Sequence, residues 1–381
     1  MMFDIVTTPR ILFGPGTTYR LGDEAKLLGN KVLLVSGQKT LQNPENNERV
    51  LRPLKQAGLQ IIHFDEVRPE PTTTMVDKGR ALARDEKCDL VIGVGGGSAL
   101  DVAKAIAGLF NEDGPASDYL AGRQITTLGL PWIAVPTTAG SGSEVTRNSV
   151  LINPEMPRKD SIRNDFWIPR VAVVDPILTM SMSPQLTAYT GMDALTHAIE
   201  AYTSRWTTAW TSGLAREAVR LIVQNFYTCY NANKKEAREK MMLGSMMAGT
   251  ALNNARAGAV HALAHPVGLK YGLSHGLVCG TLLPYVMAFN KPITRDRYAD
   301  LAYASGIVTQ KADPDQAAEK LIYFVKQLRT RLGLPEKLGA LGLKKKDIPK
   351  LVEDTLPSGS LAANARKATR DDLYNILEQN I

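Results

Sequence analysis

Short apolar runs alternate with amphipathic stretches over the first half of the chain. The runs at residues 31–36, 60–64, 90–94 and 131–135 are rich in Val, Ile and Leu and predict buried strands. Between and after them, residues 47–57, 75–86 and 99–107 have a helical pattern. Strands separated by helices need crossover connections, so we predict a doubly wound, mostly parallel sheet of the Rossmann-like kind.

The pattern changes near residue 186, where strand-like alternation becomes scarce. Helices are predicted at residues 187–202, 210–230, 235–255, 257–267 and 313–332, and one short helix follows residue 361. A length of 381 residues fits two domains better than one. We therefore predict an α/β domain over residues 1–185 and an all-helical domain over residues 186–381, with a hinge near residues 175–184.

Composition narrows the class of protein. Hydrophobic residues make up 44% of the chain and charged residues 22%, which are ordinary globular values. No apolar run reaches about 18 residues and the N-terminus lacks a signal-peptide pattern, so we expect no membrane span. Three dispersed cysteines, without a CxxC pair, favour a reducing cytoplasm. The net charge is +7, but the basic residues are scattered, and we expect no nucleic-acid partner.

Two loops that follow predicted strands have the chemistry of a phosphate site. The first, Gly95-Gly96-Gly97-Ser98, precedes a helix, whose free N–H groups and glycine backbone suit phosphate oxygens. The second, residues 136–146, carries five hydroxyl side chains and two glycines. A tight turn or a flexible surface loop would also fit each alone. Because open α/β sheets bind ligands at the carboxyl ends of strands, we favour ligand binding, although the G-x-G-x-x-G fingerprint is absent.

Four of the five histidines lie in two short segments of the predicted helical domain. Asp193 and His197 are four residues apart, as are His261 and His265, so each pair shares a helix face. A single histidine is more often an ordinary core residue than a ligand. The clustering of His275 with these four residues nevertheless favours a catalytic divalent metal, because a structural zinc usually has thiolate ligands.

Four motifs, in this order, resemble those of the iron-dependent (group III) alcohol dehydrogenase family: GGGSALDVAK from residue 95, PTTAGSGSEVT from 136, GMDALTHAIE from 191 and HALAHPVG from 261. The resemblance implies an Fe(II) ion, or Zn(II), held by Asp193, His197, His261 and His275. It places His265 outside the ligand set and near the nicotinamide, where we expect it to relay the alcohol proton to solvent.

The resemblance also implies the cofactor and substrate contacts. The expected substrate pocket is formed by Asn148, Leu252, Ala257 and Ser360. Asn148 suits a second hydroxyl on the substrate. Arg256 could anchor an anion, although a structural role is favoured. The expected cofactor contacts lie at Gly37, Gly96, Gly97, Ser98, Asp101, Thr137, Thr138, Ser141, Thr146, Lys159 and Leu178.

Two positions depart from the family pattern. Gly37 stands where NAD-using relatives carry an acid that binds the ribose hydroxyls and repels a 2′-phosphate, and Lys39 is close in sequence. This departure favours NADP(H) over NAD(H). Glu70 stands where relatives often carry asparagine, which puts one cofactor contact in doubt.

Together these features predict a metal-dependent alcohol dehydrogenase or aldehyde reductase. It would transfer a hydride between NAD(P)(H) and a primary alcohol or aldehyde bound to the metal in the cleft between the domains. The resemblance further implies a homodimer. The alternatives are a metal-dependent lyase or cyclase of the dehydroquinate-synthase-like type and a nucleotide-binding regulator that has lost catalysis.

Overall fold

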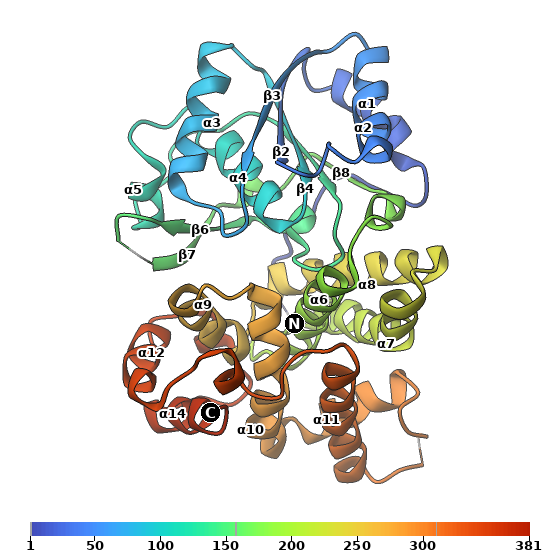
Figure 1. The fold of residues 1–381 in the computed structure, drawn as a ribbon, viewed down its shortest axis with the longest axis vertical. Helices are drawn as coiled ribbons and strands as arrows, with labels where there is room; N and C mark the ends of the chain where they lie inside the picture. The colour runs from blue at the N-terminus through green and yellow to red at the C-terminus, as the bar shows by residue number, and fades with distance from the viewer. Residues whose placement is uncertain (1, 157, 310) are drawn as a thin grey trace. The chain divides into compact units, whose positions relative to one another are not determined.

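A computed structural model describes residues 2–156, 158–309 and 311–381. The contacts divide the chain into two compact units (Figure 1). The α/β unit spans Val6–Met182, and the helical unit spans Ser183–Ile381 together with the N-terminal segment that ends at Ile5. The predicted boundary lies three residues later, and the prediction assigned the N-terminal segment to the α/β unit.

The main sheet of the α/β unit has six strands in the order β1-β8-β5-β4-β2-β3, and every neighbouring pair is parallel. This confirms the predicted fold class. A separate antiparallel hairpin and two short strands of the sheet, the edge strand β1 and its neighbour β8, were not predicted. The strands are β1 (Ile11–Phe13), β2 (Lys31–Gly37), β3 (Gln60–Val67), β4 (Leu90–Gly95), β5 (Trp132–Pro136), β8 (Val171–Val174) and the hairpin β6 (Asn148–Asn153) with β7 (Arg158–Arg163).

Both faces of this sheet are covered by helices. On β2, Val32 and Leu34 pack into the apolar cluster that includes the first two helices, whereas Leu33 and Val35 pack into the cluster on the opposite face. Because alternate residues are buried on opposite sides, the strands read as continuous apolar runs. The helices of the unit are α1 (Leu21–Lys26), α2 (Pro44–Gln56), α3 (Thr73–Asp85), α4 (Gly97–Gly108) and α5 (Ala116–Leu120).

The strand order reverses between β2 and β4. From β2 the chain crosses to β3 on one side, and then returns so that β4 and β5 lie on the other side. In doubly wound sheets the ligand binds at the carboxyl ends of the strands at such a reversal. Here β2 ends at Gly37 and β4 ends at Gly95. The reversal therefore places Gly37, a predicted cofactor contact, beside the predicted phosphate loop that begins at Gly95.

The second unit is helical, and the five helices predicted in it are present. Its elements are α6 (Pro184–Thr203), α7 (Ala209–Ala232), α8 (Lys235–Ala255), α9 (Ala259–Tyr271), α10 (His275–Ala304), α11 (Pro314–Arg331), α12 (Ile348–Thr355), α13 (Gly359–Ala363) and α14 (Arg370–Glu378). No described helix is both long enough and apolar enough to cross a bilayer.

The longest helix, α10, was not predicted. Pro284 and Pro292 lie inside its 30 residues and interrupt the helical pattern of the sequence. Packing against α6, α9 and α11 compensates for the backbone hydrogen bonds that the prolines remove. The end of the chain also forms α13 and α14 where one short helix was expected.

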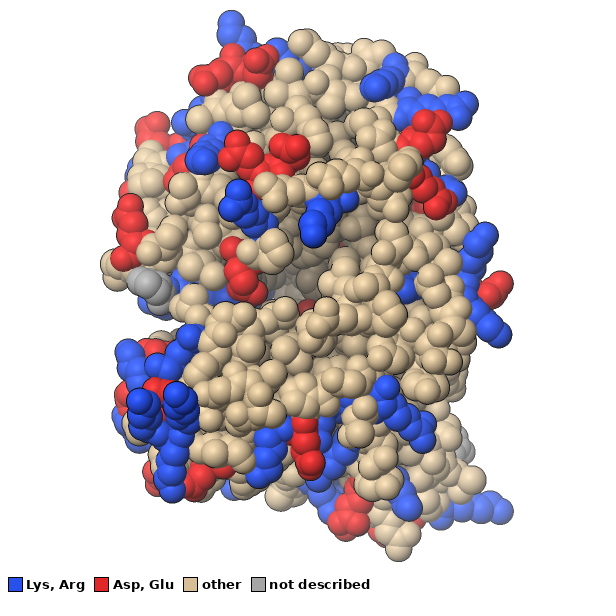
Figure 2. Space-filling view, viewed as in Figure 1, with Lys and Arg blue, Asp and Glu red and all other residues tan. Residues whose placement is uncertain are grey.

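Charged side chains of both signs are interspersed on the face of the molecule shown in Figure 2. Lysines and arginines outnumber aspartates and glutamates by 45 to 38 over the whole chain. On this face, the described basic side chains do not merge into one continuous surface of the kind that tracks a nucleic-acid backbone.

Two glycines, one in each unit, allow the packing of the two units to be tested separately. A Cβ on Gly108, at the end of α4, would lie 2.1 Å from Nε1 of the buried Trp167, whereas a Cβ on Gly213 in α7 would meet nothing within 4 Å. We expect Gly108→Ala to lower the free energy of unfolding by about 1–3 kcal/mol. Gly213→Ala should raise it by roughly 0.5–1 kcal/mol, since alanine favours a helix. Urea unfolding followed by circular dichroism measures both, and equal effects would contradict the packing described.

Candidate metal centre and cofactor-binding loops

Three helices of one unit bring the predicted metal ligands together. Asp193 and His197 lie one turn apart on α6, His261 lies in the first turn of α9, and His275 is the first residue of α10. Ser183 caps the N-terminus of α6. Its side-chain oxygen accepts a hydrogen bond from Leu186 N, and a proline follows at the first helical position, where proline is favoured. Asp193, His197 and His261 are each at most 6% exposed.

One carboxylate oxygen is the centre of this arrangement. The Nε2 atoms of the three histidines lie 3.8, 3.6 and 3.7 Å from Asp193 Oδ1, in the order His197, His261 and His275. These separations are too long for hydrogen bonds. A cation bonded at about 2.0–2.2 Å to two atoms in a tetrahedral site separates them by about 3.4 Å. The spacing therefore fits ligand atoms around one ion.

The hydrogen bonding of two of these atoms supports the same conclusion. Asp193 Oδ1 and His261 Nε2 are buried and have no hydrogen-bond partner among the residues that the structure describes. A buried polar atom without a partner costs free energy, and such an atom in a native site needs an explanation. A cation that accepts lone pairs from both atoms supplies one, so the donor set fits a divalent metal.

Protonation equilibria at the centre follow from burial and charge. Burial opposes ionisation of Asp193, but the imidazoles of His197 and His275 outweigh it and hold the pKa of this carboxyl below its usual range. Burial lowers the pKa of His261, but the Glu200 and Asp193 carboxylates outweigh that effect and raise it to about 9. A metal ion must therefore displace a proton from His261, which makes metal binding weaker at lower pH.

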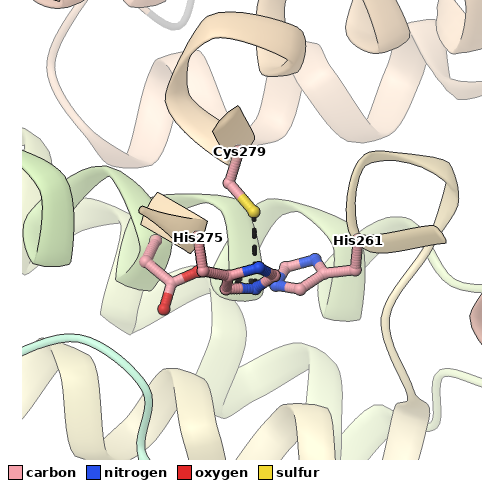
Figure 3. Close-up of side chains that lie close together, drawn as sticks. His261, His275 and Cys279 are labelled. Carbon is pink, nitrogen blue, oxygen red and sulfur yellow. Dashed lines mark hydrogen bonds and ion pairs between the residues drawn. The ribbon is translucent and has the colours of Figure 1, made fainter. Parts of the chain in front are cut away.

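A thiol that the sequence analysis did not assign lies at the same centre (Figure 3). Cys279 is one turn after His275 on α10, and its Sγ lies 3.6 Å from His275 Nε2. With Asp193 and His261 these residues form a group whose ligand atoms are all within 4.8 Å of one another. The four-residue spacing of His275 and Cys279 could have identified the thiol. However, Pro284 and Pro292 interrupt the helical pattern of the sequence, and so α10 was not predicted.

His265 lies next to the centre. It is half-buried on α9, one turn after His261, and the centroid of its ring is 5.3 Å from that of His275. The ring centroids of His197 and His261 are closer, at 4.5 Å, and stacked. His265 therefore lies within reach of a molecule held at the metal ligands, beside the imidazoles that face Asp193.

The two predicted phosphate loops contact each other in the α/β unit. A Cβ on Gly97 would lie 2.7 Å from Ser141 Oγ, and a Cβ on Gly96 would lie 3.3 Å from Thr138 Oγ1. Gly95 has φ +150°, a conformation that side chains rarely adopt. The glycines thus allow the close approach of the two loops at the N-terminus of α4, the end of a helix that attracts anions. The other predicted contacts at these strand ends are Gly37, Ser98 and Thr137.

A buried lysine joins α4 to the second loop. Lys104 Nζ donates to Ser143 Oγ and Thr146 Oγ1, both at 3.0 Å, and to the carbonyl oxygen of Asn148 at 2.7 Å. Asp101 accepts a hydrogen bond from Ser143 Oγ. Burial lowers the pKa of Lys104 to about 8, against the attraction of Asp101. Two predicted cofactor contacts, Asp101 and Thr146, are thus engaged inside the protein. Lys104 and Ser143 were missed, although the former lies one turn after Asp101.

Lys159 and Leu178, two other predicted cofactor residues, have defined contacts within the α/β unit. Lys159 on β7 forms an ion pair with Glu70, with Nζ 2.6 Å from Oε2. Glu70 has φ +59°, a conformation that asparagine adopts more readily than most residues. Leu178 is fully buried in the core of the sheet, which leaves it no exposed surface for a ligand.

The predicted substrate residues fall in both units. Asn148 begins β6 in the α/β unit, whereas Leu252, Ala257 and Ser360 lie in the helical unit. Arg256, next to Ala257, has φ +61° and ψ 163°, which is strained for any residue other than glycine. Its guanidinium lies 4.8 Å from the centroid of the Trp206 ring, and Nη1 would lie 3.3 Å from a Cβ on Gly359. Arg256 therefore borders the segment that carries Ser360.

The sequence matches two family profiles that together cover nearly the whole chain. Residues 8–176 match the profile described as iron-containing alcohol dehydrogenase. Residues 187–381 match the C-terminal profile of the Fe-containing alcohol dehydrogenase family.

Individual relatives match over similar lengths. The chain is 37% identical to 1,3-propanediol dehydrogenase of Citrobacter freundii, over 99% of this chain and 98% of that protein. It is 35% identical to lactaldehyde reductase of Escherichia coli (strain K12), over 96% of each protein. A solved structure of a 1,3-propanediol oxidoreductase has a TM-score of 0.96 and 38% identity, with 100% of both chains covered.

Loss of the central carboxylate should remove metal binding. We expect Asp193→Asn to abolish the stabilisation that metal gives the native protein, which is about 2.7 kcal/mol at a free metal concentration of 100 times Kd. Asp175→Asn is the matched control, because Asp175 is also fully buried but accepts hydrogen bonds from Thr18 in the α/β unit. Thermal unfolding with and without Zn(II) measures the effect. Equal loss of the metal-dependent shift in both variants would contradict this site.

Proposed function

This chain belongs to the family of iron-containing alcohol dehydrogenases, and on that premise we propose that it interconverts small hydroxyaldehydes and diols with NADP(H). The reaction class is metal-dependent alcohol oxidation or aldehyde reduction, as the family, the relatives and the candidate metal site support. In the proposal, the helical unit holds the metal and the α/β unit binds the dinucleotide. The homodimeric state and the cytoplasmic location stay predictions.

The observation that carries the metal assignment is the arrangement around Asp193 Oδ1. Asp193, His197, His261 and His275 would hold Fe(II) or Zn(II), and the Cys279 thiol lies close enough to favour a thiophilic ion such as zinc. When bound, the ion supplies Lewis acidity, which lowers the pKa of an alcohol and polarises an aldehyde carbonyl. The Asp193 carboxylate would offset part of the positive charge, and the buried imidazoles of His197 and His261 would limit the access of water.

His265 is the group that we propose moves the proton. Its imidazole is half-buried beside His275, so it can contact both a molecule at the metal ligands and the solvent. An imidazole gains and loses a proton near neutral pH, which suits transfer of the alcohol proton through the two ring nitrogens.

Gly37 carries the cofactor proposal. It ends β2 at the reversal of strand order, beside the glycine loop that follows β4. An acidic side chain at this place binds ribose hydroxyls and repels a 2′-phosphate, and glycine removes that repulsion. Lys39 is exposed two residues later and adds a positive charge near the same strand end.

The substrate proposal combines the names of the relatives with the polar groups of this chain. Propanediol and lactaldehyde each carry a second oxygen besides the reacting one, and both names belong to proteins at least 35% identical to this chain. Among the predicted substrate residues, the side chain of Asn148 can hydrogen-bond a second hydroxyl. Small Ala257 leaves room for a substrate longer than two carbons.

An anaerobic assay of the metal-loaded protein tests the function. Oxidation of NADPH and NADH is followed by absorbance against a panel of aldehydes with and without a 2- or 3-hydroxyl group. We expect one NADPH consumed per aldehyde, faster than NADH, with hydroxyaldehydes preferred. Metal-loaded protein that consumes neither cofactor would overturn the proposal and return attention to a lyase or cyclase, which regenerates its cofactor.

Substitution of Gly37 by aspartate should reverse the cofactor preference. We expect kcat/KM for NADPH to fall about tenfold or more, which corresponds to about 1.4 kcal/mol, while kcat/KM for NADH holds or rises. A Cβ at this position would lie 3.1 Å from Thr40 Oγ1, so Gly37→Ala is the control for crowding alone. If alanine and aspartate have the same effect, the charge argument is wrong.

Removal of the His265 imidazole should slow turnover without loss of metal. We expect His265→Ala to lower kcat roughly 10²-fold, the usual contribution of a positioned acid–base group, and added imidazole to restore part of the rate. Metal content per chain, measured by mass spectrometry, should stay at the wild-type value. Loss of metal would make His265 a ligand.

A further inference from the structure

A third acidic or basic side chain of α6 faces the metal centre. Glu200 follows Asp193 and His197 at helical spacing, which places the three residues on one face of the helix. Glu200 is 5% exposed. Its carboxylate accepts hydrogen bonds from His261 Nδ1 at 2.6 Å, from Gly258 N at 2.8 Å and from Val260 N at 2.7 Å. None of the sequence motifs assigned it a role.

The contact with His261 determines which ring nitrogen can bind a cation. An ionised carboxylate only accepts hydrogen bonds, so Nδ1 of His261 must carry a hydrogen. In the neutral imidazole the lone pair is then at Nε2, and this is the atom that lies 3.6 Å from Asp193 Oδ1. Carboxylates bonded to the far nitrogen of a histidine ligand fix its tautomer and its orientation in this way.

The same carboxylate fixes the turn that leads into α9. The first residue before this helix is Gly258, which has no side chain to cap the free N–H groups. Glu200 accepts two of them, and Asn364 accepts a third from Ala259 at 3.1 Å. A Cβ on Gly258 would lie 2.8 Å from an oxygen of each, so only glycine leaves room for both acceptors.

We propose that Glu200 is a positioning residue of the metal centre. It holds His261 as the Nδ1–H tautomer with Nε2 directed at the ion, and it ties this ligand to the turn that carries Arg256 and Ala257. The inference rests on the proposed role of His261 as a ligand. In the simpler alternative, Glu200 only caps the positive end of α9 and contributes stability.

Glu200→Gln separates these two roles. Glutamine keeps the size of the side chain, but it has one neutral acceptor oxygen, whereas Glu200 uses Oε1 for Val260 N and Oε2 for both Gly258 N and His261 Nδ1. The NH₂ group must therefore face either Nδ1 or Val260 N–H, and the charge-assisted bond that holds the Nδ1–H tautomer is lost in either orientation. The Nε2–H tautomer, whose hydrogen occupies the metal-facing position, then becomes more populated. We expect Kd for Co(II), measured by competition with a chelator, to rise about 10–100-fold, and the visible spectrum of the bound Co(II) to change.

Glu112→Gln is the matched control. Glu112 is 4% exposed in the α/β unit and, like Glu200, accepts two backbone N–H groups, from Thr126 and Thr127 at 2.6 Å each. It should lower the unfolding midpoint without changing Kd or the Co(II) spectrum. If Glu200→Gln also loses stability but keeps the wild-type Kd and spectrum, Glu200 is a helix cap only and the proposal is overturned.

Gly258→Ala provides a second route if Glu200→Gln does not fold. It leaves the carboxylate in place but crowds it, so the same change in the Co(II) spectrum is expected, with a smaller rise in Kd. A wild-type spectrum and Kd in this variant would also overturn the inference. His261→Ala separates this failure from failure of the proposed function. If wild-type protein binds Co(II) as tightly as His261→Ala does, the metal assignment itself is wrong.

Discussion

The helical unit is built around one buried carboxylate. Removing a charge from water is costly unless opposite charge and hydrogen bonds compensate for it. Asp193 has three imidazole nitrogens at 3.6–3.8 Å from one oxygen, none close enough for a hydrogen bond. Helix α6 passes through this cluster in its middle, and α9 and α10 begin at it, so their packing and the charge of the centre depend on each other. A divalent ion bound there would supply the missing partner of Asp193 Oδ1.

Topology provides the corresponding constraint in the α/β unit. Parallel strands place all their carboxyl ends on one edge, and the reversal between β2 and β4 keeps that edge clear of a crossover. Glycines at the end of β4 then allow the two loops to approach each other. The sheet thus requires small residues where the two loops meet.

Much of this could be predicted from sequence, because the relevant signals are local. Apolar runs identified β2 to β5, and helical periodicity identified α6 to α9. The features that were missed depend on contacts between residues far apart in the sequence. Pro284 and Pro292 break the pattern of α10, yet packing maintains the helix, and so Cys279 went unnoticed beside His275. The contacts of Lys104 and Glu200 join residues 42 and 61 positions away, and no spacing rule reveals them.

A comparison of Asp193 with Asp101, another buried aspartate of the same chain, supports the metal assignment. Asp101 is also a buried aspartate on a helix, but its carboxylate accepts hydrogen bonds from Ser143 and Val150, and the Lys104 ammonium lies 3.7 Å away. The α/β unit therefore satisfies a buried carboxylate with its own side chains and a backbone N–H. The helical unit surrounds Asp193 with imidazoles, and Oδ1 has no hydrogen-bond partner among the described residues. A site that only stabilised the fold would resemble Asp101, and the difference between the two is what an exchangeable cation explains.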